Sequence, residues 1–127
     1  MAPKRYIIWT IDSINLNMII NTISYMCDTL EIISHQVLCI EIQLDEDDVV
    51  LILEDIPITI LEIKENTMKK LEGTFIGEDY INVQKFLNKT RTPETIDEVL
   101  DIISVKGSVC ALNSREYYAL HRLTKEL

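Results

Sequence analysis

The spacing of apolar residues changes from a helical to a strand period near residue 36, and this change constrains the fold more than any other feature of the chain. Between residues 16 and 33, apolar side chains recur every three or four positions, as on one face of a helix. They are Leu16, Ile19, Ile20, Ile23, Met26, Cys27, Leu30 and Ile33. From Val37 to Leu44, apolar residues alternate with Cys39, Glu41 and Gln43, which predicts a strand with one buried and one wetter face. The two periods together predict an α+β fold.

An N-terminal strand should precede the helix. The β-branched and aromatic run from Tyr6 to Ile11 is typical of a strand. Asp12 or Ser13 can then cap a helix of about five turns that carries the apolar stripe. Packing of that stripe should supply most of its stability, because its many Ile, Asn and Thr residues have modest helix propensity.

An antiparallel β-meander is predicted after this helix. Its strands would be Val37 to Leu44, Val49 to Leu53 and, after Pro57, Ile58 to Ile63. The acidic run from Asp45 to Asp48 cannot enter a core, so we expect an exposed hairpin connection there. Weaker patterns follow: a short helix at 66–71, a small hairpin at 74–81 and a helical turn at 83–87.

A capped helical hairpin is predicted at the C-terminal end. Thr92-Pro93-Glu94 offers a cap, a proline at the first helical position and an acid near the positive end of the dipole. Lys106-Gly107 should end this helix. Its apolar face would consist of Ile96, Val99, Leu100 and Ile103.

The second helix of the hairpin should begin with a capping box. Asn113 and Glu116 have the required spacing, and Leu112 can pack on Tyr117 one turn later. The apolar stripe would continue through Tyr117, Leu120, Leu123 or Thr124, and Leu127. Tyr118 lies next to Tyr117 and cannot face the same way, so one of these two tyrosines should be exposed.

Residues 93–127 resemble a short helical-hairpin motif. The resemblance is carried by Ile96-Asp97-Glu98-Val99-Leu100-Asp101-Ile102-Ile103-Ser104, Lys106-Gly107, Leu112-Asn113-Ser114-Arg115-Glu116 and the run from Leu120 to Leu127. The motif is that of cytosolic C-termini of rhomboid-like membrane proteins of Bacteroidota. The chain departs from it at Ala111-Leu112-Asn113, where the motif usually has Ser-Leu-Thr, and in the acids before the final helix. Nothing resembles the membrane segments of a rhomboid, so the resemblance implies no protease activity.

Length and composition favour one folded domain over residues 1–127, with an acidic α+β core at 1–91 and the hairpin at 92–127 packed on it. Apolar residues make up 47% of the chain, and Gly and Pro number three each, which is not the composition of a disordered chain. No apolar run is long enough for a membrane span, and no signal peptide is recognisable, so we expect a cytoplasmic protein. Cys27, Cys39 and Cys110 are expected to be buried thiols.

Charge divides the sequence into two unequal halves. Between Arg5 and Lys64 there is no Lys or Arg but there are eleven acids. From Lys64 onward ten basic residues balance ten acidic ones, so the first half carries essentially all of the net charge of −9. This distribution disfavours nucleic acid and anionic membrane as direct partners, because both require clustered cations.

The sequence therefore predicts a non-enzymatic module that docks a basic partner protein through an acidic face, as immunity proteins, chaperones and inhibitors do. The predicted contact residues are Asp45, Glu46, Asp47, Asp48, Glu54, Asp55 and Tyr118. The alternative is a subunit of a larger assembly that docks through the C-terminal hairpin. A homodimer is compatible with either hypothesis.

Catalysis and metal binding are disfavoured. His35, the three cysteines and His121 do not have the spacing of paired metal ligands, so buried thiols and a helix-end histidine explain them better. The run Asp45–Asp48 lacks the glycine and the distal Glu of a calcium loop. Glu54 and Asp55 have no accompanying nucleophile, histidine or phosphate loop. We expect no cofactor, and an enzyme is the least favoured class.

Overall fold

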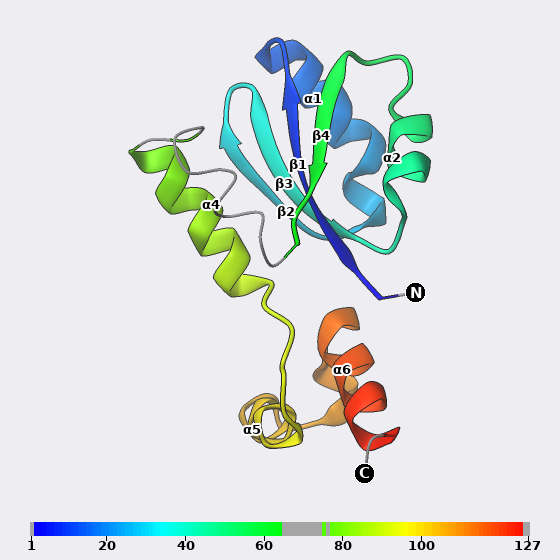
Figure 1. The fold of residues 1–127 in the computed structure, drawn as a ribbon, viewed down its shortest axis with the longest axis vertical. Helices are drawn as coiled ribbons and strands as arrows, with labels where there is room; N and C mark the ends of the chain where they lie inside the picture. Colours follow the sequence, from blue (N-terminus) through cyan, green and yellow to red (C-terminus); the bar gives the residue numbers. More distant parts are fainter. Residues whose placement is uncertain (1, 65–74, 76, 126–127) are drawn as a thin grey trace. The chain divides into compact units, whose positions relative to one another are not determined.

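The computed structural model describes residues 2–64, 75 and 77–125, and the chain divides into two compact units. The first unit spans Pro3–Lys89 and the second Thr90–Leu127 (Figure 1). The division falls beside the predicted boundary between residues 91 and 92. That the chain is one domain with the second part packed on the first stays a prediction. The helix predicted at 66–71 lies outside the described residues.

The first unit contains a four-stranded antiparallel sheet with the order β2-β3-β1-β4 (Figure 1). The strands are β1 (Lys4–Thr10), β2 (Cys27–Ser34), β3 (Val37–Ile42) and β4 (Ile58–Glu62). Helix α1 (Ser13–Ile23) links β1 to β2, and helix α2 (Glu46–Ile52) links β3 to β4. This β-α-β-β-α-β order, with β3 inserted between β1 and β2, is the split βαβ arrangement of ferredoxin-like domains. The predicted α+β class is confirmed.

Helices α1 and α2 cover one face of the sheet. Leu16, Ile19 and Ile23 of α1 are buried, and so are Val49 of α2 and Leu53, which follows it. They form one core with the strand residues Tyr6, Ile8, Leu38, Ile40 and Ile42. The predicted N-cap is confirmed, since the Asp12 carboxylate accepts a hydrogen bond of 2.8 Å from the Asn15 N–H.

Helix α4 (Glu78–Lys89) covers the opposite face. Its side chains Val83 and Phe86 are buried in a second core with the strand residues Ile7, Ile33, Val37 and Cys39. Ile63 and Phe75 belong to the same core, and the ring of Phe75 stacks on Trp9 with centroids 5.6 Å apart. The predicted helical turn at 83–87 is part of this longer helix, whereas the predicted hairpin at 74–81 is wrong from Glu78 onward.

The predicted five-turn helix is wrong in its second half. Helix α1 ends at Ile23, a short 3-10 turn η1 (Ser24–Met26) follows, and Cys27–Ser34 form β2. The apolar spacing of Met26, Cys27 and Leu30 fits a helix, but residues 27–34 pair instead with β3 along most of its length. Pairing with a neighbouring strand therefore overrides the local pattern.

The predicted meander is also wrong in its middle strand. Residues 46–52 form α2, and the acids of the expected hairpin connection lie at its N-terminus. Val49 and Leu53 are one helical turn apart and both are buried, which fixes the helix against the sheet. The wetter face predicted for β3 is not wet, because α4 covers it: Cys39 is fully buried and Glu41 is 2% exposed.

The second unit contains α5 (Ile96–Lys106), the 3-10 turn η2 (Val109–Ala111) and α6 (Ser114–Lys125). The predicted C-terminal pair of helices is confirmed. Gly107 ends α5 with φ at 84°, as predicted for a glycine cap. The capping box is confirmed too, since Asn113 Oδ1 accepts from the Glu116 N–H at 2.9 Å and Glu116 Oε1 accepts from the Asn113 N–H at 3.1 Å.

Two details of this unit differ from the prediction. The cap of α5 is Thr95 rather than Thr92: its hydroxyl accepts from the Glu98 N–H, and the Glu98 carboxylate accepts from the Glu94 N–H. The buried face of α6 runs through Glu116, Ala119 and Leu123, whereas Tyr117 is 45% exposed. The capping box and an ion pair with Lys106 hold Glu116 inward, which turns Tyr117 outward.

Candidate functional site

The acidic run predicted to bind a partner lies at the N-terminal end of α2. Asp45 is the N-cap residue, and Glu46, Asp47 and Asp48 form the first turn. All four side chains are exposed. Carboxylates are favoured in this position because they face the positive end of the helix dipole. Surface exposure of the run is therefore as predicted, although the element that carries it is a helix.

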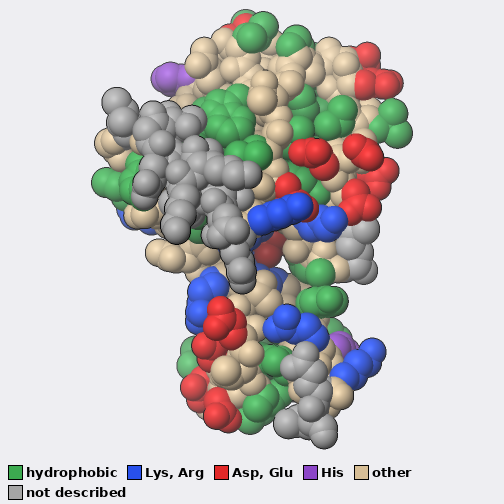
Figure 2. All heavy atoms as spheres, in the orientation of Figure 1, with side chains coloured by type: hydrophobic (Ala, Val, Ile, Leu, Met, Phe, Trp, Pro, Cys, Tyr) green, Lys and Arg blue, Asp and Glu red, His purple; other side chains and the backbone are tan. Residues whose placement is uncertain are grey.

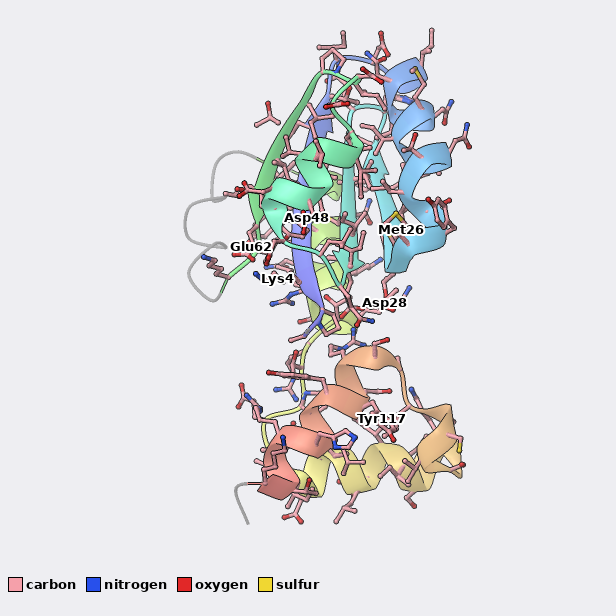
Figure 3. The ribbon with its side chains drawn as sticks, turned by 90° about the vertical axis from the view of Figure 1, so that its right-hand side faces the viewer. Lys4, Met26, Asp28, Asp48, Glu62 and Tyr117 are labelled. Atoms are coloured by element: carbon pink, nitrogen blue, oxygen red, sulfur yellow. The ribbon has the colours of Figure 1, made fainter. Side chains whose placement is uncertain are left out.

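Two further residues come to this surface from strands far away in the sequence. Lys4, at the start of β1, forms an ion pair with Asp45, and its Nζ is 3.8 Å from Glu62 Oε1 at the end of β4. Lys64 Nζ lies 3.0 Å from the other Glu62 oxygen. Figure 3 shows Lys4, Asp48 and Glu62 gathered on the same side of the first unit. We call Asp45, Glu46, Asp47, Asp48 and Glu62 the acidic face.

The electrostatic field of this face acts on Tyr6. Its hydroxyl donates a hydrogen bond of 2.7 Å to the Leu44 carbonyl, and its side chain is fully buried. Burial raises the pKa of Tyr6, and the negative charges of Glu62, Asp45, Glu46 and Asp48 raise it further. Four carboxylates from two elements therefore act on one point, so the negative potential is concentrated and not spread along the sequence.

The other predicted contact residues are distributed differently. Glu54 and Asp55 are exposed in the turn that follows α2, at the other end of the helix from the acidic run. Tyr118 is 44% exposed on α6, in the second unit. Figure 2 shows acidic side chains over the part of the first unit that contains α2. The structure thus joins Asp45–Asp48 to Glu62 and Lys4, which the sequence could not reveal because strand pairing brings them together.

The cysteines occupy three different environments. Cys39 is fully buried and Cys27 is partly buried, but Cys110 is exposed, so the prediction of buried thiols is wrong for Cys110. Burial raises the pKa of Cys39 to about 12 and that of Cys27 to about 11. In the described ranges no group of three His, Cys, Asp or Glu side chains is placed to hold a metal ion. His35 lies in the exposed turn between β2 and β3 and not at a helix end.

A groove of about 340 Å³ lies between the β2 edge of the sheet and α4. Phe86 and Ile33 are buried beside it, while Lys85 and Lys89 line it from the helix. Lys89 is not available to a ligand without rearrangement, because its Nζ pairs with Glu31 Oε1 at 2.6 Å. The groove contains no nucleophile or histidine among its lining residues, so it offers little for catalysis.

Comparison of the chain with protein-family models, with curated proteins and with solved structures gives no match. The resemblance of residues 93–127 to a Bacteroidota hairpin motif therefore stays a prediction. None of the helices in the described part of the chain has the length and apolar character needed to cross a bilayer.

Proposed function

We propose that this protein is a non-enzymatic module that binds a basic partner protein through the acidic face. One observation carries the proposal: Glu46, Asp47 and Asp48 are exposed side by side, and within the described residues none of them has an ion-pair partner. Lys4 and Lys64 neutralise only the Asp45 and Glu62 side of the face. The uncompensated charge on α2 is available to a cationic surface.

The proposed partner is a protein because the physics of such a face favours one. Complementary charge speeds association and sets specificity, and exposed carboxylates on a short helix need no rearrangement to meet Lys and Arg side chains. Nucleic acid and anionic membrane are repelled by the same charge. Immunity proteins, chaperones and inhibitors are the roles that fit, in the cytoplasm, and the protein would need no cofactor for any of them.

A capture experiment with matched variants tests the proposal. The immobilised protein is exposed to an extract of its native cells, and retained proteins are identified by mass spectrometry. The double variant Glu46→Gln/Asp47→Asn should lose the specific basic partner, and binding to wild type should weaken steeply between 50 and 300 mM salt, roughly tenfold or more.

The matched control is Asp97→Asn/Asp101→Asn, which removes the same number of charges from an exposed face of α5 and also takes one acid from a helix first turn. This control should bind the partner like wild type. A partner that is retained equally by both double variants, with no dependence on salt, would contradict the proposal.

The alternative function is that of an assembly subunit that docks through the second unit. It is favoured by the large apolar side chains exposed there, since Leu100 is 53% and Val105 is 88% exposed, and Tyr117 and Tyr118 are both nearly half exposed. Tyrosine is enriched at binding hot spots. Under this alternative Tyr118→Glu should abolish assembly and Glu46→Gln/Asp47→Asn should have little effect, which is the reverse of the first expectation.

A further inference from the structure

Helix α1 lies in the acidic half of the chain but carries no charge. From Ser13 to Cys27, through α1 and η1, there is no Asp, Glu, Lys or Arg. Exposed helix faces normally carry charged side chains, which keep the surface soluble. An uncharged surface helix in a chain of net charge −9 therefore requires an explanation.

The outer face of α1 is also apolar. Ile14 is 70%, Met18 is 46% and Tyr25 is 82% exposed, and Ile11 just before the helix is 64% exposed. Asn21 completes a spacing of three and four residues along this face. The opposite face is the one that buries Leu16, Ile19 and Ile23 on the sheet. In Figure 3, α1 runs along the outside of the first unit with side chains projecting away from the sheet.

We propose that this face, which we call the α1 face (Ile11, Ile14, Met18, Asn21 and Tyr25), binds the same face of a second copy of this chain. The arrangement would be two α1 helices packed antiparallel about a two-fold axis near Met18. Each Met18 then meets its symmetry mate, and Ile14 of each copy lies beside Asn21 and Tyr25 of the other. An isologous contact requires such a self-complementary surface.

Charge identifies the second copy as the occupant. Two chains of net charge −9 repel each other wherever their acids meet, and the α1 face is where they can approach with no acid between them. A basic partner would gain nothing from this face, since it presents no carboxylate. The nearest acids, Asp12 and Asp28, stand at the two ends of the helical segment, and the carboxylates of both accept hydrogen bonds within their own chain.

The size of the face indicates a weak dimer. One helix and the turn after it present less area than the roughly 800 Å² per partner of a standard interface. Association should therefore depend on concentration and show in sedimentation between 10 µM and 1 mM protein, roughly the range expected of a small interface. Added salt should strengthen the dimer, because it screens the remaining repulsion between acids.

Cysteine cross-linking gives the most direct test. Met18→Cys in a Cys110→Ser background, oxidised with diamide at 200 µM protein, should form a disulfide-linked dimer at least tenfold faster than the control Ile81→Cys in the same background. Ile81 is 51% exposed on α4, so accessibility of the two positions is matched. Equal rates for the two variants would overturn the proposal.

Sedimentation velocity provides the second readout on the unmodified chain. Wild type should shift from monomer to dimer as concentration rises, and Met18→Glu should weaken dimerisation at least tenfold, because it places like charges on the axis. Val105→Glu, a substitution at a side chain 88% exposed in the second unit, should leave the dimer intact. A wild-type chain that stays monomeric at 1 mM in 500 mM salt would also overturn the proposal. The basic-partner proposal is independent, since salt should weaken that complex and Met18→Glu should not remove it.

Discussion

Lys4, the first residue of β1, pairs through its ammonium group with the carboxylate of Asp45, the N-cap residue of α2. Asp45 makes no side-chain hydrogen bond to its own helix, although aspartate at this position usually does. Its charge is used instead to join the strand to the helix. The hydrogen bond with Asp45 raises the pKa of the Lys4 ammonium, so this residue stays charged throughout the physiological range.

Replacing Lys4 should expose more negative charge on the acidic face without unfolding the protein. We expect Lys4→Met to bind a decalysine peptide more tightly than wild type in 20 mM salt, by roughly twofold to tenfold. Lys85→Met is the control, because it changes the net charge equally from an exposed position on α4. Fluorescence anisotropy measures both affinities, and equal gains would mean that only net charge matters.

Phe86 should contribute much of the stability of the first unit. It is 1% exposed and lies in the core between α4 and the sheet. We expect Phe86→Ala to lower the free energy of unfolding by about 3 to 5 kcal/mol, as is usual for a buried Phe. Ile81→Ala in the same helix, at a half-exposed side chain, should cost less than about 1 kcal/mol. Urea denaturation followed by Trp9 fluorescence compares the two.

Gly107 should be replaceable at a cost set by its backbone alone. Its φ is 84°, and a Cβ added there would meet no heavy atom within 4 Å. Gly107→Ala should therefore destabilise the second unit by about 1 kcal/mol, and Gly107→Asn by less, since Asn tolerates positive φ better. Hydrogen exchange at the α5 amides reports the difference. An Asn variant as unstable as the Ala variant would point to a contact and not to backbone strain.

The capping box should be worth about as much. Asn113→Ala removes the acceptor of the Glu116 N–H, and we expect a loss of about 1 kcal/mol together with faster hydrogen exchange at that amide. Asn113→Ser restores a side-chain acceptor and should recover most of the loss. If Ser and Ala behave alike, the box is not what holds the start of α6.

The three thiols should react in the order of their exposure. A thiol reagent at pH 8 should modify Cys110 first, Cys27 slowly and Cys39 only on unfolding. The pKa of Cys39 rises from 9.0 to about 12, so the folded state holds this proton more tightly than the unfolded state does. Stability from this group is thus complete below pH 9 and is lost between pH 9 and about pH 12. Cys39→Ala should flatten that part of the stability profile, as measured by denaturation at several alkaline pH values.

Sequence signals that act within one turn of chain were reliable. The N-cap at Asp12, the glycine at the end of α5 and the box of Asn113 and Glu116 are all present as predicted. One such signal was missed: Thr95 and Glu98 have the spacing of a capping box, but the proline at 93 drew the predicted start three residues upstream. The correct cap could have been found from the sequence.

Signals that depend on a distant partner were ambiguous. The apolar residues at 27–33 fit a helical spacing, and the run Val49–Leu53 has the β-branched composition of a strand, yet they form β2 and part of α2 respectively. Each segment takes the conformation that buries its apolar side chains against the sheet. Neither outcome is encoded in the segment alone, because local propensity is worth less than tertiary packing.

The sequence by itself determined the α+β class, the uneven distribution of charge and the ends of the C-terminal helices, since these depend on composition and on short-range hydrogen bonds. Tertiary structure alone decided that α4 seals the second face of the sheet, that Lys4 and Glu62 join the acids of α2, and that the uncharged side of α1 is exposed. The physical reason is that strand pairing and core packing join residues dozens of positions apart, which no local pattern records.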